Sequence, residues 1–110
     1  MVSMGPRRAF GLIYAPSVRG HMRAIQPKYH SLVRRQVEEQ LRYEPDVETT
    51  NRKRLDPTIA LEAQWELRFG VRNEFGVFYE VDVEGRIARI LAVGVKRGTK
   101  LRVGREEIDL

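Results

Sequence analysis

The stretch QWELRFGVRNEFGVFYEVD, residues 64–82, decides the fold of this chain. It predicts two antiparallel strands, 64–70 and 75–82, joined by a tight turn at 71–74, and Asn73 suits such a turn. Along the first strand, Trp65, Leu67 and Phe69 alternate with polar residues, so one face is expected to be buried. The stretch therefore predicts a β-hairpin with one core face.

The second strand of this hairpin alternates in the same way. Phe75, Val77, Tyr79 and Val81 share one face, whereas the opposite face holds a glycine, Gly76, where a β-former is expected. Helices are expected to cover the face that carries Trp65, Leu67, Val77 and Tyr79. The other face, with Glu66, Arg68 and the Gly76 position, is expected to be open to a ligand.

A third strand is predicted at 86–95, after a turn at 83–85. It is apolar on both faces from Ile90 to Val95, which predicts a central position in the sheet. The tail, 99–110, is expected to add a short strand or to run irregularly.

Helical patterns precede the hairpin. After a short strand at 8–16, apolar residues at helical spacing predict an amphipathic helix at 17–26 and a longer one at 28–45. Residues 46–63 show no sustained period and are expected to form a loop across an end of the sheet. The order predicts one α+β domain over 1–110: an N-terminal strand, a two-helix hairpin and an antiparallel β-meander.

Composition excludes several classes of site. The chain has 110 residues and no cysteine, which excludes disulfides, thiolate metal sites and cysteine nucleophiles. No metal-ligand spacing is present, and His21 and His30 are expected to be packing or surface residues. No run is apolar enough to span a membrane, so we expect a cytoplasmic protein. The net charge of +5, with a basic segment at 96–110, favours an anionic partner.

Three segments, WELRFG, EFGVFYEVD and RIARILAVGVKRG, resemble the RelE/ParE superfamily of type II toxin–antitoxin toxins, on its RelE-like side. The resemblance covers about residues 9–97 and implies a RelE-like fold. It also implies an mRNA interferase, an endoribonuclease that enters the ribosomal A site and cleaves mRNA through attack of the ribose 2′-OH on the adjacent phosphate. The implied partners are a cognate antitoxin, the ribosome and mRNA, with no cofactor, metal or membrane.

The same resemblance implies the catalytic residues. Arg68 matches the basic position of the first hairpin strand, Glu66 is a candidate general base, and Lys96 or Arg97 matches the basic residue after the last strand. The strand-two arginine of the family falls on Gly76. Many members also carry a C-terminal Tyr or His as proton donor, but this chain has no Tyr after 79 and no His after 30.

Other basic residues are candidates for contact with nucleic acid: Arg72, Lys53, Arg54, Lys100 and Arg102. From the turn, Arg72 is hypothesised to reach the space left by Gly76. Two alternatives to the nuclease stay open: a ParE-like inhibitor of DNA gyrase without nuclease activity, and a degenerate, non-toxic binding member of the superfamily.

Overall fold

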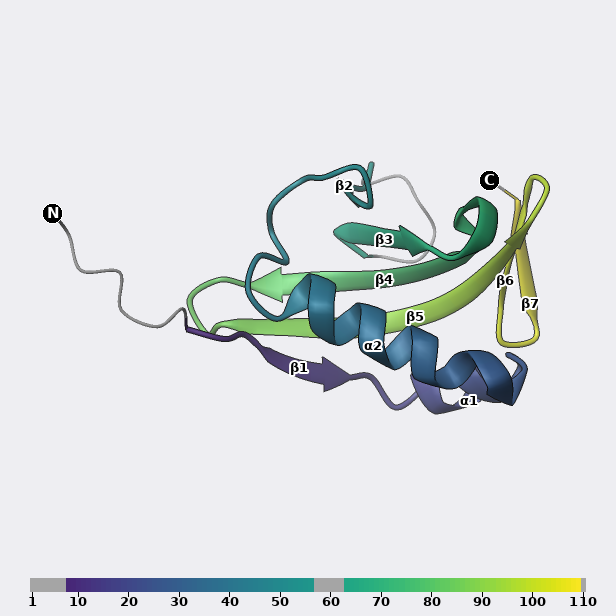
Figure 1. The fold of residues 1–110 in the computed structure, drawn as a ribbon, viewed down its shortest axis with the longest axis horizontal. Coiled ribbons are helices and arrows are strands. Elements are labelled where there is room, and N and C mark those ends of the chain that lie inside the picture. The colour runs from purple at the N-terminus through teal and green to yellow at the C-terminus, as the bar shows by residue number, and fades with distance from the viewer. Residues whose placement is uncertain (1–7, 57–62, 110) are drawn as a thin grey trace, which may run out of the picture.

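The structure is a computed structural model that describes residues 8–56 and 63–109. It is an α+β fold in which two helices lie against one small sheet of seven strands (Figure 1). Six strands follow one another in the order β2-β3-β4-β5-β6-β7, and β1 pairs with β5. Within the described residues, no helix is long and apolar enough to cross a membrane.

The elements follow the chain as strands and helices with these bounds: β1 Gly11–Tyr14, α1 Val18–Arg23, a 3₁₀ turn Pro27–Tyr29, α2 His30–Leu41, β2 Arg52–Arg54, β3 Trp65–Phe69, a 3₁₀ turn Val71–Asn73, β4 Phe75–Asp82, β5 Ile87–Arg97, β6 Lys100–Val103 and β7 Glu106–Asp109.

The predicted hairpin is confirmed as β3 and β4. Their antiparallel register places Trp65 opposite Tyr79 and Arg68 opposite Gly76. The predicted central strand is also confirmed, because β5 pairs with β4 along one edge and with β1 and β6 along the other. β5 is apolar on both faces because it contributes to both buried clusters: Ala88, Ile90 and Val93 belong to one, and Ala92 belongs to the other.

The second edge of β5 is covered by three different elements. β1 pairs with it in parallel as far as Ile90, and β6 pairs with it from Gly94 onward. Between them, α1 and the residue before it supply side chains: the Ser17 hydroxyl donates to the Leu91 carbonyl at 3.4 Å, and the Val93 N–H donates to His21 Nδ1 at 3.3 Å. The backbone groups of β5 thus find partners where no strand lies beside them.

The core lies between the helices and the sheet, as the alternation predicts. Val33, Val37 and Leu41 form the buried stripe of α2, and they pack with the buried residues of β3, β4 and β5. The buried sheet residues of this cluster are Trp65, Leu67, Phe69, Phe75, Val77, Tyr79, Ala88, Ile90 and Val93. The prediction that helices cover Trp65, Leu67, Val77 and Tyr79 is confirmed.

The prediction of a loop at 46–63 is wrong for its middle, because Arg52–Arg54 forms β2 and pairs with β3. Three residues are too few to show a period in the sequence. Arg52 is buried, and its guanidinium donates to the Val47 carbonyl at 3.0 Å and to the Gln40 carbonyl and Oε1 at 2.8 Å. Residues 57–62 of the predicted loop lie outside the described residues.

Helix bounds are shorter than predicted. α1 ends at Arg23, and α2 begins after a 3₁₀ turn and ends at Leu41 instead of reaching Pro45. The carbonyl of Pro45 accepts a hydrogen bond from the buried Tyr79 hydroxyl at 2.7 Å, so this segment is held against the sheet instead of continuing the helix.

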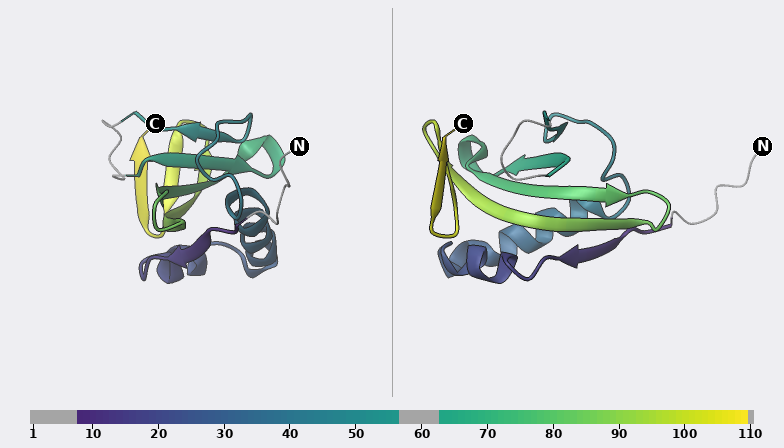
Figure 2. Two further views of the ribbon diagram at one scale, coloured as in Figure 1. Left: turned by 90° about the vertical axis from the view of Figure 1, so that its left-hand side faces the viewer. Right: turned by 180° about the vertical axis from the view of Figure 1, so that it is seen from behind.

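The tail forms a hairpin, β6–β7, that crosses the end of the sheet (Figure 2). Leu101 and Val103 pack with Phe78 and Ala92 in a second buried cluster on the face opposite the helices. The prediction that this face is open to a ligand is therefore wrong in part. Gly94 permits the close approach of β6, because a Cβ there would lie 2.8 Å from the Arg102 carbonyl oxygen.

Candidate functional site

A groove of about 560 Å³ lies where the turn before β4 meets the end of β5. Its lining includes Arg72 from the turn and Lys96 and Arg97 from the strand. Glu74 is the carboxylate of the lining, which is completed by Val71 and Gly98. Three residues that the sequence proposes as site residues are thus brought together from two separate segments.

The backbone holds the two walls of this groove together. The Lys96 N–H donates to the Glu74 carbonyl at 2.6 Å, which joins the end of β5 to the turn. Within the turn, Arg72 has φ 57° and Asn73 has φ 53°. This left-handed conformation reverses the chain sharply after Gly70, and it leaves the Arg72 side chain exposed beside the strand end.

Arg68 is tied to the same turn. Its Nε lies 3.1 Å from Glu66 Oε1, with the two side chains only 17% and 16% exposed, and its Nη1 donates to the Asn73 carbonyl at 3.3 Å. Asn51 fixes the backbone: its carbonyl accepts the Arg68 N–H at 2.8 Å and its Nδ2 donates to the Arg68 carbonyl at 3.0 Å. The guanidinium is therefore held in a set position beside the groove.

Strand alternation places Lys96 on the face of the sheet that carries Glu66 and Arg68. Arg97, the next residue, belongs to the opposite side of the strand end. Lys53 joins the charged face, because its Cα is the register partner of Glu66. Lys53, Glu66, Arg68 and Lys96 form what we call the charged face, which has three cations and one carboxylate and meets the groove at Lys96.

The other basic candidates lie elsewhere. The Arg54 guanidinium sits 5.5 Å from the centre of the Trp65 ring, which gives it a cation–π contact away from the charged face. Lys100 and Arg102 belong to β6, outside the groove lining. β7 returns acidic side chains to β6: Lys100 Nζ lies 3.9 Å from Glu107 Oε2, and Glu107 is also the register partner of Arg102.

Gly76 is buried instead of open. A Cβ built on it would lie 3.2 and 3.3 Å from two ring atoms of Phe78 and 3.9 Å from Arg68 Nε. The ring of Phe78 therefore fills the space over the glycine, in the manner by which aromatic rings shield strand glycines. The hypothesis that Arg72 reaches this space is wrong, because Arg72 lines the groove and Phe78 occupies the position.

Sequence reasoning missed Glu74, as well as the holding roles of Asn51 and the Asn73 carbonyl. Glu74 belongs to the quoted turn but has no spacing that marks it. Asn51 is 17 positions from Arg68 and meets it through the pairing of β2 with β3. No signal in the sequence marks that strand, because its three residues, 52–54, are too few to show a period.

Two titratable side chains, Tyr79 and His21, form hydrogen bonds outside the groove. Burial raises the pKa of Tyr79, whose hydroxyl donates to the Pro45 carbonyl beneath the helices. Burial lowers the pKa of His21, and its Nδ1 accepts from the backbone of β5. In residues 8–56 and 63–109, no group of three or more His, Cys, Asp or Glu side chains is arranged to hold a metal ion.

No family model matches the chain, and no curated protein and no solved structure matches it in the two further comparisons.

Proposed function

We propose that this chain is the toxin component of a type II toxin–antitoxin system, with a RelE-like fold and the activity of a ribosome-dependent mRNA endoribonuclease. The observation that carries the proposal is the convergence of Arg72, Lys96 and Arg97 on one groove, with Arg68 fixed beside it. This arrangement gathers cations from two strands, β3 and β5, and from a turn around a groove that can accept a phosphodiester.

The chemistry needs a base, a cation and an acid. The 2′-oxygen attacks phosphorus, the bond from phosphorus to the 5′-oxygen breaks, and the products are a 2′,3′-cyclic phosphate and a 5′-hydroxyl. The 2′-OH proton passes to a base, and a proton must reach the leaving 5′-oxygen. Arg68 suits the developing phosphorane charge, because a guanidinium binds phosphate oxygens and keeps its own protons.

The proton carriers are carboxylates and a lysine in this proposal. Glu66, at 3.1 Å from Arg68, takes the 2′-OH proton, and Glu74 stands as a second candidate base from the groove wall. Lys96 gives a proton to the leaving oxygen, because its ammonium can release one whereas Arg97 cannot. This assignment separates two residues that the sequence left as alternatives.

The partners follow from the same proposal. The chain acts in the cytoplasm on mRNA held by the ribosome, and a cognate antitoxin holds it inactive. Its net charge of +5 suits approach to the ribosome, whose RNA is anionic.

A ParE-like inhibitor of DNA gyrase is the second candidate function. The observation that favours it is the composition of the groove lining, which offers no His or Tyr for proton transfer. The filling of the Gly76 position by Phe78 favours the third candidate, a non-toxic binding member, because a family arginine has no room there.

The test is primer-extension mapping of mRNA after induction of the chain in a bacterial host, with Arg68→Ala and Arg35→Ala in parallel. Arg35 is exposed on α2 and outside the groove lining, so it is the matched control. New 5′ ends with wild type and Arg35→Ala, and their loss with Arg68→Ala, would support the nuclease. Arrested thymidine uptake without cleavage would support the gyrase inhibitor, and no arrest of growth would support the third candidate.

A further inference from the structure

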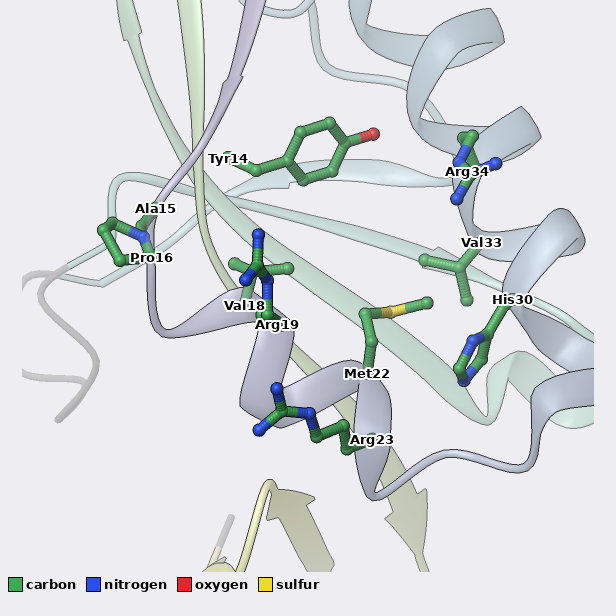
Figure 3. Close-up of a pocket in the computed structure, with 10 residues that line it drawn as sticks. All are labelled: Tyr14, Ala15, Pro16, Val18, Arg19, Met22, Arg23, His30, Val33 and Arg34. Carbon is green, nitrogen blue, oxygen red and sulfur yellow. The ribbon is translucent and has the colours of Figure 1, made fainter.

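A second cavity, of about 850 Å³, lies between the end of β1, α1 and α2 (Figure 3). Its floor is aliphatic, with Ala15, Val18, Met22 and Val33. Val18 and Val33 are buried, and Met22 reaches from α1 toward α2 in Figure 3. A floor of this kind accepts a large apolar side chain, and methionine adapts its shape to what binds.

The rim of this cavity is cationic. Arg19 and Arg23 come from α1, and Arg34 comes from α2 (Figure 3). All three are exposed, and none has an ion pair with a carboxylate in the described part of the chain. No Asp or Glu belongs to the lining, and the carboxylate of Glu38, whose charge acts on Tyr14, lies outside it.

Tyr14 stands at the strand side of the rim. Its side chain is 43% exposed, and burial of the remainder raises the pKa of its hydroxyl, with the charge of Glu38 adding to this rise. The hydroxyl therefore stays protonated at neutral pH and offers a donor to an incoming oxygen. Apolar floor, arginine rim and an aromatic donor are the composition of a protein-binding hot spot.

We infer that this cavity binds an acidic segment of a partner protein, with one large apolar side chain on the aliphatic floor and carboxylates on Arg19, Arg23 and Arg34. Arginine favours this pairing, because its planar fork meets a carboxylate with two parallel hydrogen bonds. The floor favours protein over nucleic acid, since its four aliphatic side chains suit an apolar side chain and Tyr14 on the rim is the one Phe, Tyr or Trp of the described lining on which a base could stack.

The inference is independent of the proposed nuclease. The cavity shares no lining residue with the groove at Arg72, Lys96 and Arg97. A partner segment in the cavity would leave the groove accessible, and a failure of one proposal leaves the other standing.

The test uses fluorescence anisotropy with a short, fluorescein-labelled peptide that is rich in glutamate and carries two leucines. The wild-type chain is expected to bind it, and Arg34→Gln is expected to weaken binding about tenfold, as loss of a charge-assisted hydrogen bond predicts. The matched control is Arg35→Gln, the neighbouring exposed arginine outside the cavity lining, which should change the affinity less than about twofold.

A second pair of measurements tests the floor. Met22→Gln is expected to weaken binding about tenfold and Met22→Leu to restore it, and a peptide with glycine in place of leucine should bind about tenfold more weakly. Circular dichroism of each variant checks that the chain remains folded.

Several outcomes would overturn the inference. Equal effects of Arg34→Gln and Arg35→Gln, or equal binding of the leucine-free peptide, would show that net charge alone attracts the peptide. A ribo-oligonucleotide that depends on Arg34 while the peptide does not would make the cavity a nucleic-acid site. Loss of peptide binding in Lys96→Gln, with Arg34→Gln unaffected, would place the peptide in the groove instead.

Discussion

The two faces of the central sheet use their polar residues differently. On the face under the helices, polar side chains hold the backbone: Tyr79 donates to the Pro45 carbonyl, and Arg52 donates to the carbonyls of Val47 and Gln40. On the opposite face, a small apolar cluster sits beside the charged face, where Glu66 and Arg68 pair with each other at 3.1 Å. Tyr79 and Arg52 are buried, whereas the Glu66–Arg68 pair keeps some exposure through which an anionic ligand could reach the guanidinium.

The two faces therefore differ in what they contribute to stability and to the binding of anions. The larger core cluster draws on both helices and three strands, and the smaller one draws mainly on β4, β5 and β6. Substitutions under the helices should therefore affect folding first, and substitutions on the charged face should affect anion binding first. Five measurements test this division, and they are given in order of decreasing expected effect.

Leu67→Ala removes a fully buried side chain under the helices. It should lower the free energy of unfolding by about 2–5 kcal/mol, through lost burial and the cavity left behind. Urea denaturation followed by circular dichroism measures the change. Val71→Ala is the control, because Val71 is 75% exposed, and the division of the faces fails if both variants lose the same stability.

Arg52→Met leaves the Val47 and Gln40 carbonyls without their donor. It should cost about 2–3 kcal/mol of stability, since unsatisfied groups at a buried site are costly. The matched control is Lys53→Met, the exposed neighbour on the same strand, for which about 0.5 kcal/mol or less is expected. Equal urea midpoints for the two variants would contradict the holding role of Arg52.

Lys96→Gln removes one cation from the groove while leaving the backbone bond from Lys96 to Glu74 in place. Binding of a single-stranded ribo-oligonucleotide should weaken, and the slope of log affinity against log salt should fall by about 0.7. Filter binding over a range of salt measures both, with Arg35→Gln as the control. An unchanged slope would remove Lys96 from the anion site.

His21 predicts a dependence of stability on pH. Burial lowers its pKa in the folded chain, the carboxylate of Glu106 opposing part of this shift, so the unfolded chain binds the proton more readily. The stability contributed is present above the ordinary pKa of about 6.5 and is lost as the pH falls through it toward the folded value.

Urea denaturation at pH 5.5 and pH 7.5, which bracket that pKa of about 6.5, measures the effect of His21. His21→Gln keeps an acceptor for the Val93 N–H and should show a smaller loss of stability at the lower pH than wild type. His30→Gln is the control, because the ring of His30 forms its hydrogen bond with the Ile25 carbonyl in the helical region and does not contact the backbone of β5 as His21 does. The same loss in wild type and His21→Gln would assign the titration to another group.

Lys100→Gln should have the smallest effect. Its ammonium lies 3.9 Å from Glu107 Oε2, and more than half of each side chain is exposed. Such surface pairs contribute about 0–0.5 kcal/mol, and that is the expected change in unfolding free energy. A larger loss would show that the β6–β7 hairpin depends on its charges more than on Leu101 and Val103.

Much of the fold could be predicted from residue patterns. Alternation in 64–82 identified β3 and β4 and the face that the helices cover, and the apolar run in 86–95 identified the central strand. β2 and the β6–β7 hairpin could not be assigned, because their three or four residues are too short to show a period. Their place is decided by pairing with strands already formed.

For the candidate site, the sequence could predict which residues take part but not how their side chains are arranged. Arg68, Lys96 and Arg97 were named from the strand motifs, and the structure places them beside or within one groove. The clamp of Asn51 on Arg68 and the ring of Phe78 over Gly76 depend on side-chain directions across paired strands. The pattern of a single sequence carries no such information. It therefore could not show that the ring of Phe78 fills the space beside Gly76.

The parallel pairing of β1 with β5 has a consequence for synthesis on the ribosome. Residues 11–14 of the nascent chain lack their partners until residues 87–90 have been made. At the usual rates of translation, the interval lasts several seconds. During that time Leu12 and the apolar stripe of α2 lack the strand β5 that they pack against, so the newborn chain is most prone to aggregate or to be captured by a chaperone shortly before β5 emerges.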